Sequence, residues 1–219
     1  MITESQGKYI DPGPLKRLKK VLVEWQSMQD TSWWEEKNDA PWWYNERASL
    51  SLFAGAVWKC KGWVFEEFIT KKHMTTRKGK RKNRHGRGDI MFGIKGQGFV
   101  AEAKQCWPNI GRNIDSVLKE VESYLESALD GVYQEPNYGL QRVGIVFVSP
   151  RIHRSQVYKF KKTELKKRLN NFRSRLLRRI KNVTIAWNFP KGWLQPKGRE
   201  KYIYPGIILL IKSRRILKE

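Results

Sequence analysis

Two acidic residues and one lysine occur among apolar neighbours. Asp89 begins the run 89–94, and Glu102 and Lys104 lie in the run 99–105. Side chains alternate between the two faces of a strand, so Glu102 and Lys104 point to the same face. A turn over 93–98 would fold the two runs into a hairpin and bring Asp89 opposite this pair. Buried carboxylates need a partner charge, so we expect the three side chains to form one site.

A helix could bring a third carboxylate to this site. Glu46 shares a helical face with Leu50, Phe53 and Val57, which directs it towards the interior. Two alternatives stay open. An acid next to Asn45 is also an ordinary choice for a helix start, and Glu66 or Glu67 could supply the extra ligand instead.

Two or three carboxylates beside a lysine form a hard oxygen site that suits Mg²⁺. Hydrolysis of a phosphodiester needs such an ion, because the ion neutralises developing charge and activates the attacking water. The ammonium of Lys104 could orient that water, stabilise the phosphate in the transition state or, if desolvated, act as a general base. The sequence leaves these three roles open.

The remaining pattern shows which elements must position these residues. Strands are predicted over Trp63–Thr70, Asp89–Ile94, Phe99–Gln105, Arg142–Ser149, Val183–Asn188 and Tyr202–Lys212, and helices over Leu15–Gln29, Trp43–Trp58 and Ile114–Leu129 and in 159–181. This order predicts an α/β fold with a mixed central sheet flanked by helices. We expect a helical, Trp-containing N-terminal extension over 1–40 and one domain over 41–219.

The chain carries 44 Lys and Arg against 21 Asp and Glu, a net charge of +23. The excess gathers in 71–88, expected to be a mobile basic loop, and in the basic helix 159–181. Such a balance favours nucleic acid as the partner, and we favour DNA over RNA. The residues expected to bind it are Lys78, Lys80, Arg81, Lys82, Arg84 and Arg87. The alternative is that these charges only keep the surface solvated.

Composition bears on several other classes. Hydrophobic residues make up 40% of the 219 residues, enough for a core, which argues against a disordered chain. The longest apolar stretch is far shorter than the roughly 20 residues that span a bilayer, so we expect no membrane contact and a cytoplasmic location. Cys60 and Cys106 show neither a disulfide framework nor zinc-ligand spacing.

Gly88-Asp89 followed by Glu102-Ala103-Lys104, with Glu46 on a preceding helix, resembles the PD-(D/E)xK nuclease superfamily, which has the restriction-endonuclease-like fold. The order of a helix, three strands, a helix and a strand is similar as well. Gly88 stands where the family name has proline. The resemblance implies that Asp89, Glu102, the carbonyl of Ala103 and Glu46 bind the metal and that Lys104 acts on the water.

What this resemblance implies is a Mg²⁺-dependent nuclease in which Mn²⁺ can substitute. The size and the basic segment are similar to junction-resolving, transposon-end, restriction-type and phage or defence endonucleases. Two other functions stay open, a non-catalytic nucleic-acid-binding protein and an RNA-directed nuclease. A homodimer stays open too, as does a partner protein bound through the tryptophans of the N-terminal region, Trp33, Trp34, Trp42 and Trp43.

Overall fold

A computed structural model describes residues 7–30, 39–75, 81–159, 162–190 and 201–214, with side chains omitted at 73–75, 81–84 and 162. The helices are α1 (Lys19–Gln29), α3 (Glu46–Lys59), α4 (Ile114–Tyr133), α5 (Arg154–Lys159) and α6 (Lys162–Arg179), with 3-10 turns at Lys16–Leu18 and Pro41–Trp43. The strands are β1 (Lys8–Asp11), β2 (Trp63–Thr75), β3 (Arg81–Ile94), β4 (Gln97–Cys106), β5 (Gln141–Val148), β6 (Ile152–His153), β7 (Thr184–Asn188), β8 (Tyr202–Ile203) and β9 (Ile207–Lys212).

Seven of the strands form one mixed sheet in the order β1-β7-β9-β5-β4-β3-β2. The β4–β5 pair is parallel, and all the other neighbours are antiparallel. Parallel neighbours need a crossover connection, which α4 supplies. The predicted α/β class with a mixed sheet flanked by helices is therefore confirmed.

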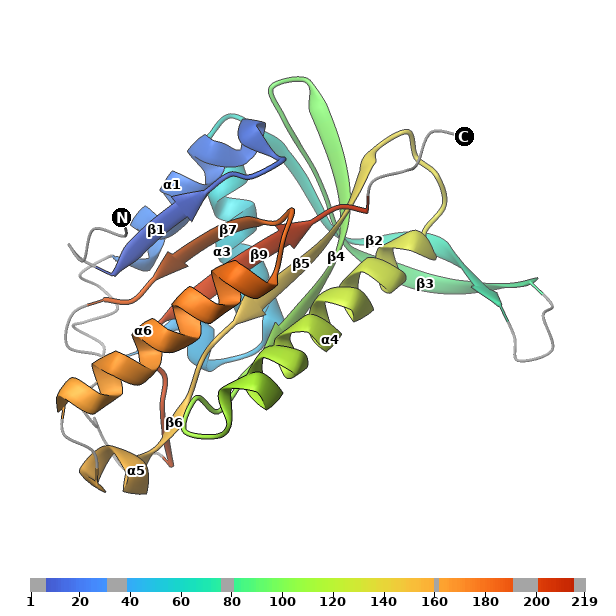
Figure 1. Cartoon of the computed structure of the whole chain (residues 1–219). Helices are drawn as coiled ribbons and strands as arrows, with labels where there is room; N and C mark the ends of the chain where they lie inside the picture. Colours follow the sequence, from blue (N-terminus) through green and yellow to red (C-terminus); the bar gives the residue numbers. More distant parts are fainter. Residues whose placement is uncertain (1–6, 31–38, 76–80, 160–161, 191–200, 215–219) are drawn as a thin grey trace.

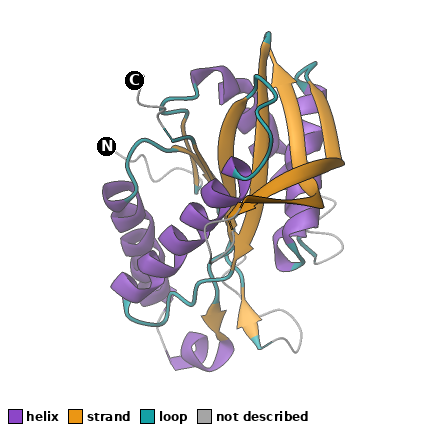
Figure 2. Ribbon diagram, turned by 90° about the vertical axis from the view of Figure 1, so that its right-hand side faces the viewer, coloured by secondary structure: helices purple, strands orange, loops and turns teal. Residues whose placement is uncertain are grey.

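Apolar side chains from both faces of the sheet build two cores, and Figure 2 shows helices on both sides of the strands. On one face, α1 and α3 pack over Phe92, Phe99 and Ala101. On the other face, α4 and α6 pack over Val146 and Leu210. In the described part of the chain, no helix is long and apolar enough to cross a membrane.

The basic segment 71–88 differs from the expected mobile loop. Its described residues are strand: β2 and β3 pair from Trp63–Gly93 out to Thr75–Arg81, with one position skipped at Glu67 and Asp89. Figure 1 shows the two strands as a long hairpin that projects past the end of α4. We call β2 and β3 together the basic hairpin. The loop prediction failed because strand pairing depends on a partner strand, which the local composition of a charged segment does not reveal.

The N-terminal region is also more closely integrated than an extension would be. β1 pairs with β7 as an edge strand of the main sheet. Trp25 and Leu22 of α1 are fully buried in the core beneath the sheet. Trp42 is fully buried too, which leaves it unavailable to a partner protein, whereas Trp33 and Trp34 lie outside the described residues.

Candidate functional site

The site lies where β3 separates from β4. The pairing of these two strands runs from Ile94–Gln97 to Ile90–Ala101 and stops there. Beyond this last pair, the amide of Ala103 on β4 donates to a side chain of β3 instead of to its backbone: Oδ2 of Asp89 accepts this hydrogen bond at 2.7 Å. On the outer side, Glu67 has a positive φ of 54° at the point where the rungs of β2 and β3 skip Asp89. At Asp89, therefore, β3 separates from β4 but continues beside β2.

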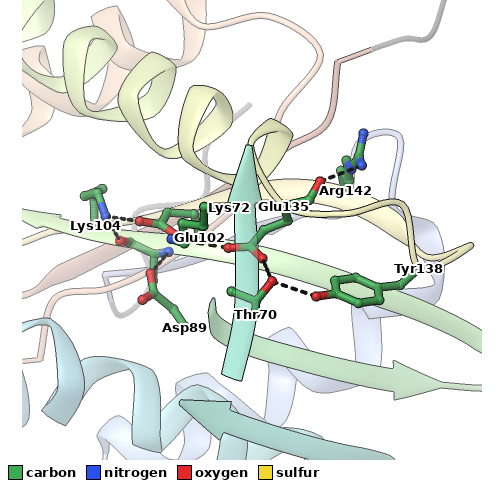
Figure 3. A network of polar contacts seen from close by, with 9 residues as sticks. Thr70, Lys72, Asp89, Glu102, Lys104, Glu135, Tyr138 and Arg142 are labelled. Atoms are coloured by element: carbon green, nitrogen blue, oxygen red, sulfur yellow. Dashed lines mark hydrogen bonds and ion pairs between the residues drawn. The ribbon is translucent and has the colours of Figure 1, made fainter. Parts of the chain in front are cut away.

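Glu102 and Lys104 project from the same face of β4, two residues apart. The Nζ of Lys104 donates to Oε1 of Glu102 at 2.8 Å and to the carbonyl of Ala103 at 2.9 Å. Figure 3 shows Asp89, Glu102 and Lys104 gathered around this stretch of backbone. One positive charge thus bridges two of the oxygens that the sequence suggests as metal ligands, and Asp89 is bonded to the same peptide segment.

Two charged residues that the sequence analysis did not single out join this cluster. The Nζ of Lys72, on β2, lies 2.9 Å from Oε2 of Glu102 and 3.2 Å from Oε1 of Glu135. Glu135 follows α4, and its side chain is only 1% exposed. It accepts a hydrogen bond from Thr70, whose hydroxyl lies 2.7 Å from that of Tyr138. Thr70 and Lys72 are two residues apart on β2, so their side chains lie on the same face of the strand. This spacing is the sequence signal that could have grouped them.

Glu46 begins α3, whose N-cap is Asn45. Burial raises the pKa of Glu46 to about 7, with Lys104 opposing the rise and Asp89 and Glu102 adding to it. The charges of Asp89, Glu102 and Lys104 thus act on the carboxylate of Glu46. Among the described contacts, however, it makes no hydrogen bond or ion pair with them. Glu46 therefore interacts with the cluster through its charge, and not through a direct contact that is described.

Gln105 fixes α3 against the strand that carries the site. Its buried side chain accepts a hydrogen bond of 2.9 Å from the hydroxyl of Ser49 on α3. It also donates to the carbonyl of Trp42 at 3.2 Å. Because Gln105 directly follows Lys104, these bonds hold the start of α3 in a set position relative to Glu102 and Lys104.

The carboxylates of the cluster differ in their electrostatics. Burial and the charge of Glu102 raise the pKa of Asp89, although the amide of Ala103 and two lysines oppose the rise. Burial also acts to raise the pKa of Glu102, but hydrogen bonds from Lys104 and Lys72 outweigh it and leave that pKa below its usual value. Glu102 is therefore neutralised by lysines, whereas Asp89 and Glu46 lack sufficient positive charge around them.

These observations test whether the residues fit a divalent cation. The oxygens are carboxylates and a backbone carbonyl, the ligands that Mg²⁺ prefers, and an ammonium already lies between two of them. The raised pKa values of Asp89 and Glu46 show that further positive charge would be favourable. In the geometry described, no three acidic, histidine or cysteine side chains are arranged as a metal site. The types of donor are therefore those of a Mg²⁺ site, whereas in the present arrangement lysines pair with both oxygens of Glu102.

Four of the six residues expected to bind nucleic acid lie on β3. Arg87 is exposed and pairs with Glu67 at 3.4 Å, and Glu67 also pairs with Arg47 of α3. Arg81, Lys82 and Arg84 lie on β3, with side chains outside the described part, and Lys78 and Lys80 fall outside it altogether. Their contacts with nucleic acid stay a prediction.

The basic helix predicted over 159–181 corresponds to the end of α5 and to α6. Part of its charge is balanced within the molecule. Arg175 lies 3.2 Å from Asp115 of α4, and Arg179 lies 2.7 Å from Glu122 of the same helix. This face therefore offers fewer free charges than the sequence suggests.

The chain matches no protein-family model, no curated protein and no solved structure.

Proposed function

We propose that the protein is a metal-dependent nuclease that hydrolyses phosphodiester bonds within DNA. One observation carries this proposal: the carboxylate of Asp89 accepts a hydrogen bond from the amide of Ala103, and Lys104 donates to both Glu102 and the carbonyl of Ala103, at the place where the pairing of β3 with β4 ends. The arrangement of α3, then β2, β3 and β4, then α4 and β5 supports a restriction-endonuclease-like core. It is the arrangement expected from the resemblance to the PD-(D/E)xK superfamily.

Asp89, Glu102, the carbonyl of Ala103 and Glu46 would hold the ion, which is Mg²⁺ or Mn²⁺. When bound, the ion supplies a water of lowered pKa and neutralises charge on the phosphate. The residues of the chain orient these parts. The amide of Ala103 holds Asp89 by one oxygen, which fixes the direction of its carboxylate. Lys104 lies beside the same backbone, where its ammonium can donate to a water or to a phosphate oxygen.

The surface around the site supports a polyanionic substrate. The whole chain has a net charge of +23, and the charged part of the basic hairpin begins beside Asp89. A substrate strand that follows the hairpin would pass directly over the cluster. DNA and RNA both satisfy this charge argument, so a test of cleavage must include both.

A non-catalytic nucleic-acid-binding protein is the second candidate. The ion pairs of Glu102 favour it, because Lys104 and Lys72 engage one carboxylate oxygen each. In this alternative the acids only balance the charge of the lysines. Tight, salt-sensitive binding without cleavage would then be expected.

The two candidates are separated by cleavage of a panel that contains plasmid, linear duplex, single strand, four-way junction and structured RNA, with Mg²⁺, Mn²⁺ or EDTA. We expect wild type to cut DNA only with metal, and Asp89→Asn and Lys104→Ala to lose cleavage while still binding. Glu126→Gln, an exposed acid on α4, is the matched control and should cut normally. Metal-dependent cleavage that survives in Asp89→Asn would reject the proposed site, and binding without cleavage in every lane would favour the second candidate.

A further inference from the structure

The basic hairpin brings a second lysine to the candidate site. Lys72 belongs to β2, which is separated from β4 by β3, yet its ammonium reaches Glu102. The contact lies where β3 no longer pairs with β4, although β2 and β3 stay paired with each other. Figure 3 shows Lys104 on one side of Glu102 and Lys72 on the other. The two oxygens of Glu102 are thus bound by lysines from different strands, at 2.8 Å and 2.9 Å.

Lys72 also forms an ion pair with the buried carboxylate of Glu135, at 3.2 Å. The side chain of Glu135 is 1% exposed, that of Glu102 is 12% exposed and that of Lys72 is 20% exposed. Burying so many charges costs desolvation energy, and an apolar pair would fill the same space at a lower cost. Thr70 fixes the remaining oxygen of Glu135, and Arg142 donates to its backbone carbonyl at 2.8 Å. Glu135 can therefore keep Lys72 in place when Glu102 turns elsewhere.

We propose that Lys72 is a second lysine of this site, which exchanges Glu102 for a phosphate of the substrate when Glu102 binds a divalent cation, and that Glu135 is the positioning residue that retains it. The inference rests on the proposed function. A divalent ion attracts the carboxylate of Glu102 and repels the ammonium beside it, so the two cations compete. The released ammonium then lies next to the place where an anionic phosphate would meet the ion.

Competition between the cations is tested by calorimetric titration of Mg²⁺ and Mn²⁺ into protein free of nucleic acid. Lys72→Gln should bind the ion about fivefold more tightly, because it removes one competing charge at close range. Glu135→Gln should bind it more weakly, because it removes a negative charge and leaves Lys72 to Glu102 alone. Lys72→Arg should resemble wild type. Lys71→Gln is the matched control, since it removes the same charge from the neighbouring exposed residue, which points to the other face of β2.

Equal cation affinity of Lys72→Gln and Lys71→Gln would overturn the competition. If Glu135→Gln fails to fold, the comparison of these two lysine variants still decides the question. The phosphate contact is tested by steady-state cleavage of a short DNA duplex: Lys72→Gln should raise KM more than it lowers kcat, and Lys72→Arg should restore KM. A wild-type KM in Lys72→Gln would overturn the contact while leaving the nuclease intact. Absence of cleavage in wild type would reject the nuclease and this contact, while the titration would still decide the competition.

Discussion

At the scale of single residues, the site is defined by unequal charge compensation. Glu102 has two lysine partners, and its pKa lies below the usual value despite burial. Burial raises the pKa values of Asp89 and Glu46, because the groups that oppose it do not outweigh it: the amide of Ala103 and two lysines for Asp89, and Lys104 and Arg47 for Glu46. A cluster of this kind favours an additional cation, and in the metal-free protein it should show as a dependence of stability on pH.

Glu46→Gln tests this dependence in metal-free protein. The pKa of Glu46 is raised from 4.5 to about 7 on folding, so the folded state keeps a proton that the unfolded state releases between these values. Ionised Glu46 therefore costs stability that is absent below pH 4.5, grows as pH rises and is complete above pH 7. Glu46→Gln should raise the free energy of unfolding at pH 8 by about 1 kcal/mol, after allowance for solvent screening of a partly exposed group. At pH 4 it should change little.

Urea denaturation at the two pH values, in EDTA, measures both quantities. Arg47, the other charged neighbour on α3, has the opposite sign and lowers the pKa of Glu46. Arg47→Gln should therefore increase the destabilisation at pH 8. An effect of Glu46→Gln that is equal at pH 4 and pH 8 would contradict the charge interpretation.

At the scale of the elements, α4 shapes the pocket for Glu102 through a glycine. A β-carbon at Gly131 would lie 2.8 Å from Cγ and 3.0 Å from Cδ of Glu102. Gly131→Ala should therefore displace the Glu102 side chain and lower cleavage by about tenfold or more. The gain in helix propensity, about 1 kcal/mol, should offset the crowding in the free energy of unfolding.

Gly55→Ala on α3 is the matched control. Its β-carbon would meet only the flexible side chain of Met28, with the terminal methyl group at 3.0 Å and the sulfur at 3.8 Å, and this side chain can move aside. We expect a gain of about 0.5–1 kcal/mol in the free energy of unfolding and unchanged cleavage. Cleavage assays and thermal melts of the two variants give the comparison, and a fully active Gly131→Ala would show that Glu102 is not constrained by α4.

The basic residues between positions 78 and 84 carry a prediction of their own. Replacing Lys78, Lys80, Arg81, Lys82 and Arg84 together with Gln should weaken binding to all DNA sequences, because phosphate contacts are insensitive to sequence. The slope of log affinity against log salt should become shallower by up to about 4.5, because each phosphate that the protein neutralises contributes about 0.9 to this slope. Fluorescence anisotropy in the Asp89→Asn background, over a salt series, measures the slope without cleavage.

An equal number of neutralised charges on another surface controls for net charge. Lys159, Lys166, Lys167, Arg178 and Lys181 are all exposed on or near α5 and α6. If both sets of substitutions change the salt slope equally, binding depends on net charge and not on phosphate contacts of the residues in 78–84.

Local patterns predicted the central part of the site, and non-local contacts explain what was missed. Glu102 and Lys104 were placed together by the alternation of β4, and Asp89 was added through a short turn. Lys72 and Glu135 escaped prediction because they meet only after the basic hairpin leaves the sheet beside the end of α4. β1 was missed because its pairing with β7 joins residues at opposite ends of the chain, and a short segment without an apolar alternation gives little local signal.

At the scale of the whole molecule, the sheet joins the two ends of the chain. β1 forms one edge of the sheet, and β2 of the basic hairpin forms the other edge. β7 and β9, from the C-terminal half of the chain, lie between β1 and β5. The core under α1 and α3 draws residues from Leu15 to Ile211. Residues on both sides of position 40 thus share one hydrophobic core.

Expression of residues 41–219 alone tests this unity. Removing 1–40 deletes the edge strand β1 and exposes the surface that Leu18, Leu22 and Trp25 cover, each of which is fully buried. Burial of one such side chain contributes about 1.5–3 kcal/mol, so the loss of all three should approach the whole stability of a typical domain. We expect the fragment to lack a cooperative thermal transition by circular dichroism, whereas the full chain should show one. A cooperatively folded 41–219 fragment would instead identify 1–40 as a separable extension and the remainder as an independent domain.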